Sequence, residues 1–110
     1  MDWTRGATYY DGNIKYTAAF VDPRGCYQQV VVTEAGRIFH MVRGRKGPHP
    51  VTSREIIPEA RAVGNPTITF SSLLGLVEIS CPLEGIGVAM WALPLTEIPD
   101  PSGDEPHPFA

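Results

Sequence analysis

Residues 27–42, YQQVVVTEAGRIFHMV, decide the fold. Val30, Val31 and Val32 follow one another in the first half, and β-branched side chains favour an extended backbone. Glu-Ala-Gly at positions 34–36 forms a turn, after which residues 37–42 return with alternating side chains. Because a run of valines has no polar side to turn towards water, it is typical of a strand covered on both faces. The stretch therefore predicts a β-hairpin whose first strand is buried on both sides.

Short runs of β-forming residues alternate with turn residues on both sides of this hairpin. The sequence predicts further strands over residues 7–10, 14–21, 67–71, 73–80 and 88–95. Turn signals separate them at residues 11–13, 22–25, 44–50, 64–66 and 81–87. Gly75 is a candidate β-bulge, and Pro94 indicates the end of an edge strand. The pattern predicts an all-β (mainly β) fold, a small antiparallel β-sandwich or barrel of about six to eight short strands.

Residues 53–62 are the only candidate for a helix. Ser53 is a suitable cap, but a capping box requires Glu or Gln at position 56, where Ile56 stands. Pro58 would also remove a hydrogen bond from a helix interior. We therefore expect at most one short helical turn near residues 53–62, with an extended segment over residues 53–57 as an equal alternative.

Length and composition indicate one globular domain with a tail. The chain has 110 residues, of which 43% are hydrophobic and 19% charged, which fits a folded domain rather than a disordered chain. We expect residues 1–97 to form a single mainly-β domain and residues 98–110, rich in proline and acids, to form an extended C-terminal tail. Since we find no signal peptide or transmembrane pattern, the expected location is cytoplasmic or virion-associated.

The charges are divided unevenly along the chain. Residues 1–61 hold all nine Lys and Arg and six acids, whereas residues 62–110 hold six acids and no Lys or Arg. The net charge of −3 makes nucleic-acid binding unlikely as a general function. A basic front and an acidic back are suited to steering a protein partner or aligning copies of the chain.

The sequence offers no catalytic or metal-binding motif. It contains no nucleophile elbow, zinc-protease motif or phosphate-binding loop, so we predict that the protein is not an enzyme and uses no cofactor. Cys26 with His40 or His49 could supply a nucleophile and its base, but any chain that contains Cys and His offers such a pair. His40, His49 and His107 lie far apart in sequence, so no metal site is expected. We expect Cys26 and Cys81 to be buried free thiols.

Basic residues between positions 37 and 54 are the first candidate partner-binding feature. The candidates are Arg43, Arg45, Lys46, His49 and Arg54. They either face phosphate or an acidic protein surface, or they form a solvated loop.

Aromatic residues and the tail are the second and third features. Trp3, Tyr9 and Tyr10 either form an exposed patch for a partner or pack into the core. The tail either reaches across a neighbour and anchors Phe109 in an apolar pocket, or it is a solubilising terminus.

These features favour a non-enzymatic module for protein–protein interaction or assembly, whose partner is another protein or copies of itself. Small β proteins with extended arms occur among virus- or phage-type structural accessory (decoration-like) proteins, an analogy at the level of fold. The first alternative is a monomeric inhibitor or adaptor that binds a foreign protein through its basic loop. The second is a small-molecule-binding β-barrel.

Overall fold

The computed structural model describes residues 3–5, 13–45 and 51–101. These residues form strands and one short 3-10 helix. In chain order they are β1 (Thr4–Arg5), β2 (Ile14–Val21), β3 (Tyr27–Thr33), β4 (Ile38–Arg43), β5 (Val51–Ile56), β6 (Thr67–Ser71), β7 (Leu76–Leu83), β8 (Gly87–Pro94) and η1 (Leu95–Glu97). The expected all-β fold is confirmed.

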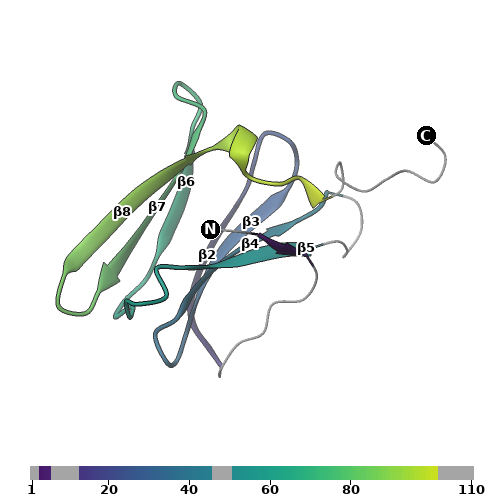
Figure 1. The fold of residues 1–110 in the computed structure, drawn as a ribbon. Helices are drawn as coiled ribbons and strands as arrows, with labels where there is room; N and C mark the ends of the chain where they lie inside the picture. Colours follow the sequence, from purple (N-terminus) through teal and green to yellow (C-terminus); the bar gives the residue numbers. More distant parts are fainter. Residues whose placement is uncertain (1–2, 6–12, 46–50, 102–110) are drawn as a thin grey trace.

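The strands form two antiparallel sheets (Figure 1). The larger sheet has the order β1-β5-β4-β3-β2, and the smaller has the order β6-β7-β8. The sheets meet where β2 lies against β6, so β8 is the edge strand farthest from this contact. Because Pro94 is the last residue of β8, its predicted place at the end of an edge strand is also confirmed.

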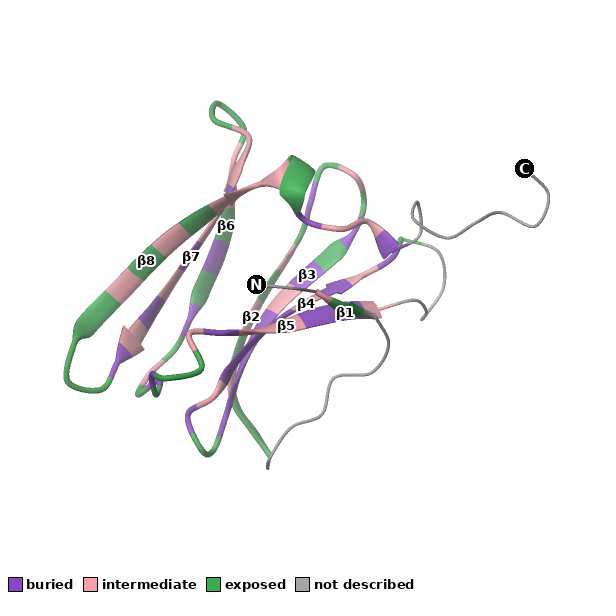
Figure 2. Cartoon of the chain, in the orientation of Figure 1, coloured by how far each residue is buried: buried purple, intermediate pink, exposed green. Residues whose placement is uncertain are grey.

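The β3–β4 hairpin is the centre of the larger sheet, as residues 27–42 predicted. Val30, Val31 and Val32 are each 0% exposed, so β3 is covered on both faces. Val30 and Val32 belong to the core between the sheets, together with Ile79 of the smaller sheet. Val31 faces the opposite side, because neighbouring residues of a strand point to opposite faces. Figure 2 shows that burial is concentrated in β3 and β4, whereas the edge strands β2 and β8 contain only half-buried and exposed residues.

Of the two alternatives for residues 53–62, the extended segment is confirmed, since residues 53–56 belong to strand β5 (Val51–Ile56). Residues 53–56 are extended and pair with β4, from Met41 opposite Ser53 to Ile38 opposite Ile56. The chain then turns at Ile57, whose φ of +49° is unusual for a β-branched residue. Pairing with β4 satisfies the backbone of Ser53–Ile56, which a helix broken by Pro58 would not do.

Two predicted boundaries in the smaller sheet were wrong. Gly75 does not form a bulge. It ends a tight turn, with a φ of +66° and an N–H that donates to Ser71 O, and β7 begins at the next residue, Leu76. At the other end β7 continues through Pro82 to Leu83, although Pro82 had indicated a turn. β7 pairs with β6 only as far as Ser80. Because Pro82 lies beyond this point, its lack of an N–H costs no hydrogen bond between β6 and β7.

The first residues of the predicted tail pack against the domain. Ile98 is 2% exposed and belongs to the core, and Pro101 is fully buried. Arg24 donates hydrogen bonds to the carbonyl oxygens of Ile98 and Pro99 at 2.7 and 3.3 Å. The segment after η1 is therefore a docked part of the fold as far as Pro101.

Candidate interaction surfaces

The structure does not gather the predicted partner-binding residues on one surface. Five of the nine, Tyr9, Tyr10, Lys46, His49 and Phe109, lie outside the described residues. Arg43 and Arg54 lie on opposite faces of the larger sheet: Arg54 pairs with His40, and Arg43 is three positions further along β4. Arg45 follows β4 and pairs with Asp100 of the segment after η1. The basic stretch is thus divided among three environments.

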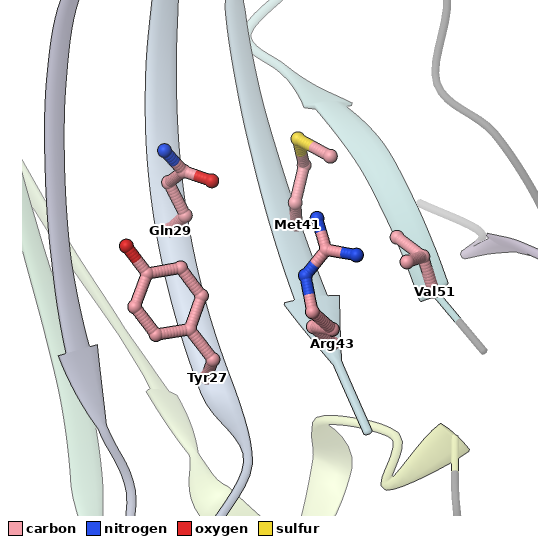
Figure 3. A pocket seen from close by; sticks show the side chains of 5 residues that line it. All are labelled: Tyr27, Gln29, Met41, Arg43 and Val51. Atoms are coloured by element: carbon pink, nitrogen blue, oxygen red, sulfur yellow. The ribbon is translucent and has the colours of Figure 1, made fainter. Parts of the chain in front are cut away.

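Arg43 lines a pocket on the outer face of the larger sheet (Figure 3). The other lining residues are Tyr27 and Gln29 from β3, Met41 from β4 and Val51 from β5. They share one face because Tyr27, Arg43 and Val51 are aligned across the three strands, as are Gln29 and Met41. Tyr27 is 40% exposed, so this outer-face pocket is open to solvent.

The outer-face pocket is a shallow depression, and its empty space of about 150 Å³ includes open solvent. Sites for drug-sized ligands usually span about 300–1,000 Å³. The outer-face pocket encloses no such volume, so it suits contact with a protein surface better than binding of a small molecule. Tyr, Met and Arg are also residue types that protein–protein interfaces favour.

A second exposed feature is the outward side of strand β8. Val88 and Met90 are 66% and 76% exposed, and Ile86 in the preceding turn is 70% exposed. The eight residues GVAMWALP of β8 include no charged side chain. We refer to Ile86, Val88 and Met90 as the β8 surface. Residues 88–95 were predicted to be the last strand, and the structure adds that no strand of the described residues lies beyond β8.

A buried polar chain runs across the inner face of the larger sheet. Gln28 Nε2 donates to Asp22 Oδ2 at 2.8 Å, and Gln28 Oε1 lies 3.0 Å from His40 Nε2. Burial alone would raise the pKa of Asp22, but hydrogen bonds from Arg24, Gln28 and the Cys26 backbone hold it below its usual value. An ionised Asp22 can only accept hydrogen bonds, so the amide nitrogen of Gln28 faces Asp22 and its amide oxygen faces His40. That oxygen accepts from His40 Nε2, which therefore carries the proton of the neutral ring.

Trp3 and Arg54 complete this inner polar region. The Trp3 ring meets His40 edge-on at 4.9 Å, and the Arg54 guanidinium lies 4.7 Å from the Trp3 ring centre. Burial, and then the charge of Arg54, lowers the pKa of His40 to about 3. Trp3 is therefore half-buried against the larger sheet. This favours the alternative in which Trp3 packs onto the core over the one in which it forms an exposed patch.

Both cysteine thiols lie in surroundings that disfavour the thiolate. Cys26 and Cys81 are buried and free, as expected. Burial, followed by the Asp100 carboxylate, raises the pKa of Cys26 to about 12, so this thiol is a poor nucleophile. Among the described residues no group of three His, Cys, Asp or Glu side chains could hold a metal ion. No helix within these residues is long and apolar enough to cross a membrane.

Comparison of the chain with protein-family models, with curated proteins and with solved structures found no match.

Proposed function

We propose that this chain is a non-enzymatic protein-interaction module that associates with copies of itself through the edge of strand β8. The observation that carries the proposal is the exposed apolar side of an edge strand without charged residues. Natural edge strands are usually protected by lysine, by a central proline or bulge, or by a covering element. In β8 the only such residue is Pro94, at its last position.

A second copy is the occupant that the composition of β8 favours. Two β8 strands paired antiparallel place no like charges opposite each other, because the strand has no charge. With Met90 opposite its own copy on a two-fold axis, Val88 and Ala92 of the two chains become neighbours on one face. Such pairing would satisfy the free backbone edge and cover the β8 surface in one step.

The test is the solution mass of the full chain and of Met90→Lys, measured by size exclusion with light scattering over a range of concentrations. Met90 is 76% exposed, so a lysine fits there without entering the core. Val21→Lys is the matched control, since Val21 is 64% exposed on the other sheet. We expect dimers for the wild type and for Val21→Lys and monomers for Met90→Lys. A wild-type monomer at every concentration, or an unchanged mass for Met90→Lys, contradicts the proposal.

The outer-face pocket supports a second candidate function, an adaptor that binds one foreign protein. Its Tyr, Met and Arg lining is of the residue types that protein–protein interfaces favour. A photo-crosslinking amino acid in place of Tyr27 should give one discrete adduct in cells of the source organism. The same amino acid in place of Thr69, exposed on the other sheet, is the control. An adduct with the mass of two copies supports self-association instead, and the absence of an adduct specific to position 27 contradicts the adaptor function.

A further inference from the structure

Several buried polar side-chain atoms have no hydrogen-bond partner among the described residues. They are His40 Nδ1, Thr52 Oγ1, Arg54 Nε and, from the smaller sheet, Trp91 Nε1. Native proteins leave few buried polar atoms unsatisfied, so a group of them on one inner face requires an explanation. His40, Thr52 and Arg54 share that face, because His40 pairs with Arg54 and Thr52 is two residues before Arg54.

His40 Nδ1 in particular requires a donor. Because Gln28 Oε1 accepts from His40 Nε2, the proton of the neutral ring is on Nε2 and Nδ1 presents a bare lone pair. The ring is 0% exposed, and an unmade hydrogen bond at such a depth is costly. Its edge-on neighbour Trp3 does not satisfy Nδ1, which has no hydrogen-bond partner among the described residues.

Arg54 requires an acceptor and a negative charge. Its guanidinium lies over Trp3, and no acidic side chain within residues 3–5, 13–45 and 51–101 forms an ion pair with it. Burial lowers the pKa of Arg54, because removing the guanidinium from water disfavours its charged form. Arg37 and Arg45 of the same basic stretch both have carboxylate partners, Glu55 and Asp100. Arg54 is the exception, and its half-buried side chain leaves it within reach of a ligand.

We propose that Trp3, His40 and Arg54 form a binding site for a small oxyanion that also carries a hydroxyl group. The oxyanion accepts from the Arg54 guanidinium, whose planar fork suits carboxylate and phosphate oxygens. The hydroxyl donates to His40 Nδ1. An internal water alone would satisfy His40, but it would leave the charge of Arg54 without a counter-ion. Hydroxycarboxylates and hydrogen phosphate share the required chemistry.

The test uses lactate and inorganic phosphate as probes, with propionate as the analogue that lacks the hydroxyl. The ¹⁵N resonance of His40 Nδ1 is followed by NMR in the wild-type protein, so this readout requires no substitution. We expect saturable binding of lactate, phosphate or both, with a shift of Nδ1 as it accepts a hydrogen bond. Propionate should bind about tenfold more weakly than lactate, because it leaves Nδ1 without a donor. Comparing lactate with phosphate distinguishes a carboxylate ligand from a phosphate ligand.

Arg54→Gln tests the anion contact, and Arg61→Gln is the control for loss of one positive charge. Within the described part of the chain, the side chain of Arg61 donates to the carbonyl oxygens of Pro58 and Ala60. In a Trp91→Phe background, tryptophan fluorescence reports Trp3 alone, since the chain has two tryptophans. We expect Arg54→Gln to weaken probe binding at least about tenfold and Arg61→Gln to leave it unchanged. Absence of saturable binding of both lactate and phosphate, or equal binding of lactate and propionate, would overturn the proposal.

Discussion

Arg24 donates a 2.7 Å hydrogen bond to the carbonyl oxygen of Ile98, 74 positions away, while its guanidinium pairs with Asp22 at 2.9 Å. One side chain thus joins the turn after β2 to the segment after η1. Asp22 is fully buried at its side chain, and it also accepts from Gln28 and from the backbone of Cys26. The position of residues 98–101 and the inner polar chain therefore depend on the same carboxylate.

We expect Arg24→Met to lower the free energy of unfolding by about 2 kcal/mol, because it leaves a buried charge without its cationic partner. Methionine keeps much of the apolar stem, so the loss is mainly of hydrogen bonds. Urea denaturation measures the effect, and Arg61→Met is the control at an exposed arginine. Amide exchange at Ile98 should accelerate in Arg24→Met as the segment loosens. Unchanged stability together with unchanged exchange at Ile98 would show that Arg24 does not hold the segment.

The hairpin at residues 27–42 could be predicted because its signals are local. Three successive valines require cover on both faces, and Gly36 provides the φ of +84° that the turn needs. The strand order could not be predicted, since the pairing of β1 with β5 joins residues about fifty positions apart. Pro94 indicated an edge at the end of β8, but for the same reason the sequence did not show which strand β8 pairs with.

The candidate site was harder to predict than the fold. Arg43, Arg45 and Arg54 are close in sequence, but strand alternation and long-range pairing place them on the outer face, beside Asp100 and beside Trp3. A local charge count cannot distinguish these environments. The alternation of β4 did contain the necessary signal: residues 39, 41 and 43 share a face that His40 does not.

Gly36→Ala should destabilise the protein more than Gly85→Ala. Both glycines have positive φ, +84° and +75°, so each alanine carries a backbone strain of about 1 kcal/mol. A Cβ at Gly36 would also lie 3.2 Å from Ala62 O and from Arg61 Cβ, whereas a Cβ at Gly85 meets nothing within 4 Å. We expect a loss of about 2–3 kcal/mol for Gly36→Ala. Equal losses in thermal or urea unfolding would show that the neighbours of Gly36 move aside freely.

Neither thiol should react with a disulfide reagent in the folded protein at pH 8. Burial, followed by the Asp100 carboxylate, raises the pKa of Cys26 to about 12, and burial raises the pKa of Cys81. Reaction requires the thiolate and access to it, and the fold restricts both. A colorimetric thiol assay should detect two thiols in denaturant and react slowly without it. Rapid native reaction of one thiol would indicate local opening near that residue.

Stability should fall as pH is lowered from about 6.5 towards 4, with His40 as the main cause. The pKa of His40 is about 3 in the folded protein, against an ordinary value of 6.5. Between these values the unfolded chain binds a proton that the folded protein does not, so unfolding becomes more favourable as pH falls. The slope expected from one such group is about 1.4 kcal/mol per pH unit. The stabilisation from Asp22, whose pKa is lowered from 3.8, is lost only at more acidic pH.

His40→Gln separates this contribution from the rest of the pH profile. Glutamine cannot titrate, so the variant should be less stable than the wild type at pH 7 and should have a flatter profile between pH 6.5 and 4.5. Urea denaturation at several pH values in this range measures both profiles. The difference in unfolding free energy between wild type and variant should therefore narrow as pH falls. Parallel profiles would mean that His40 gains its proton in the folded protein as readily as in the unfolded chain, and that burial does not keep His40 neutral.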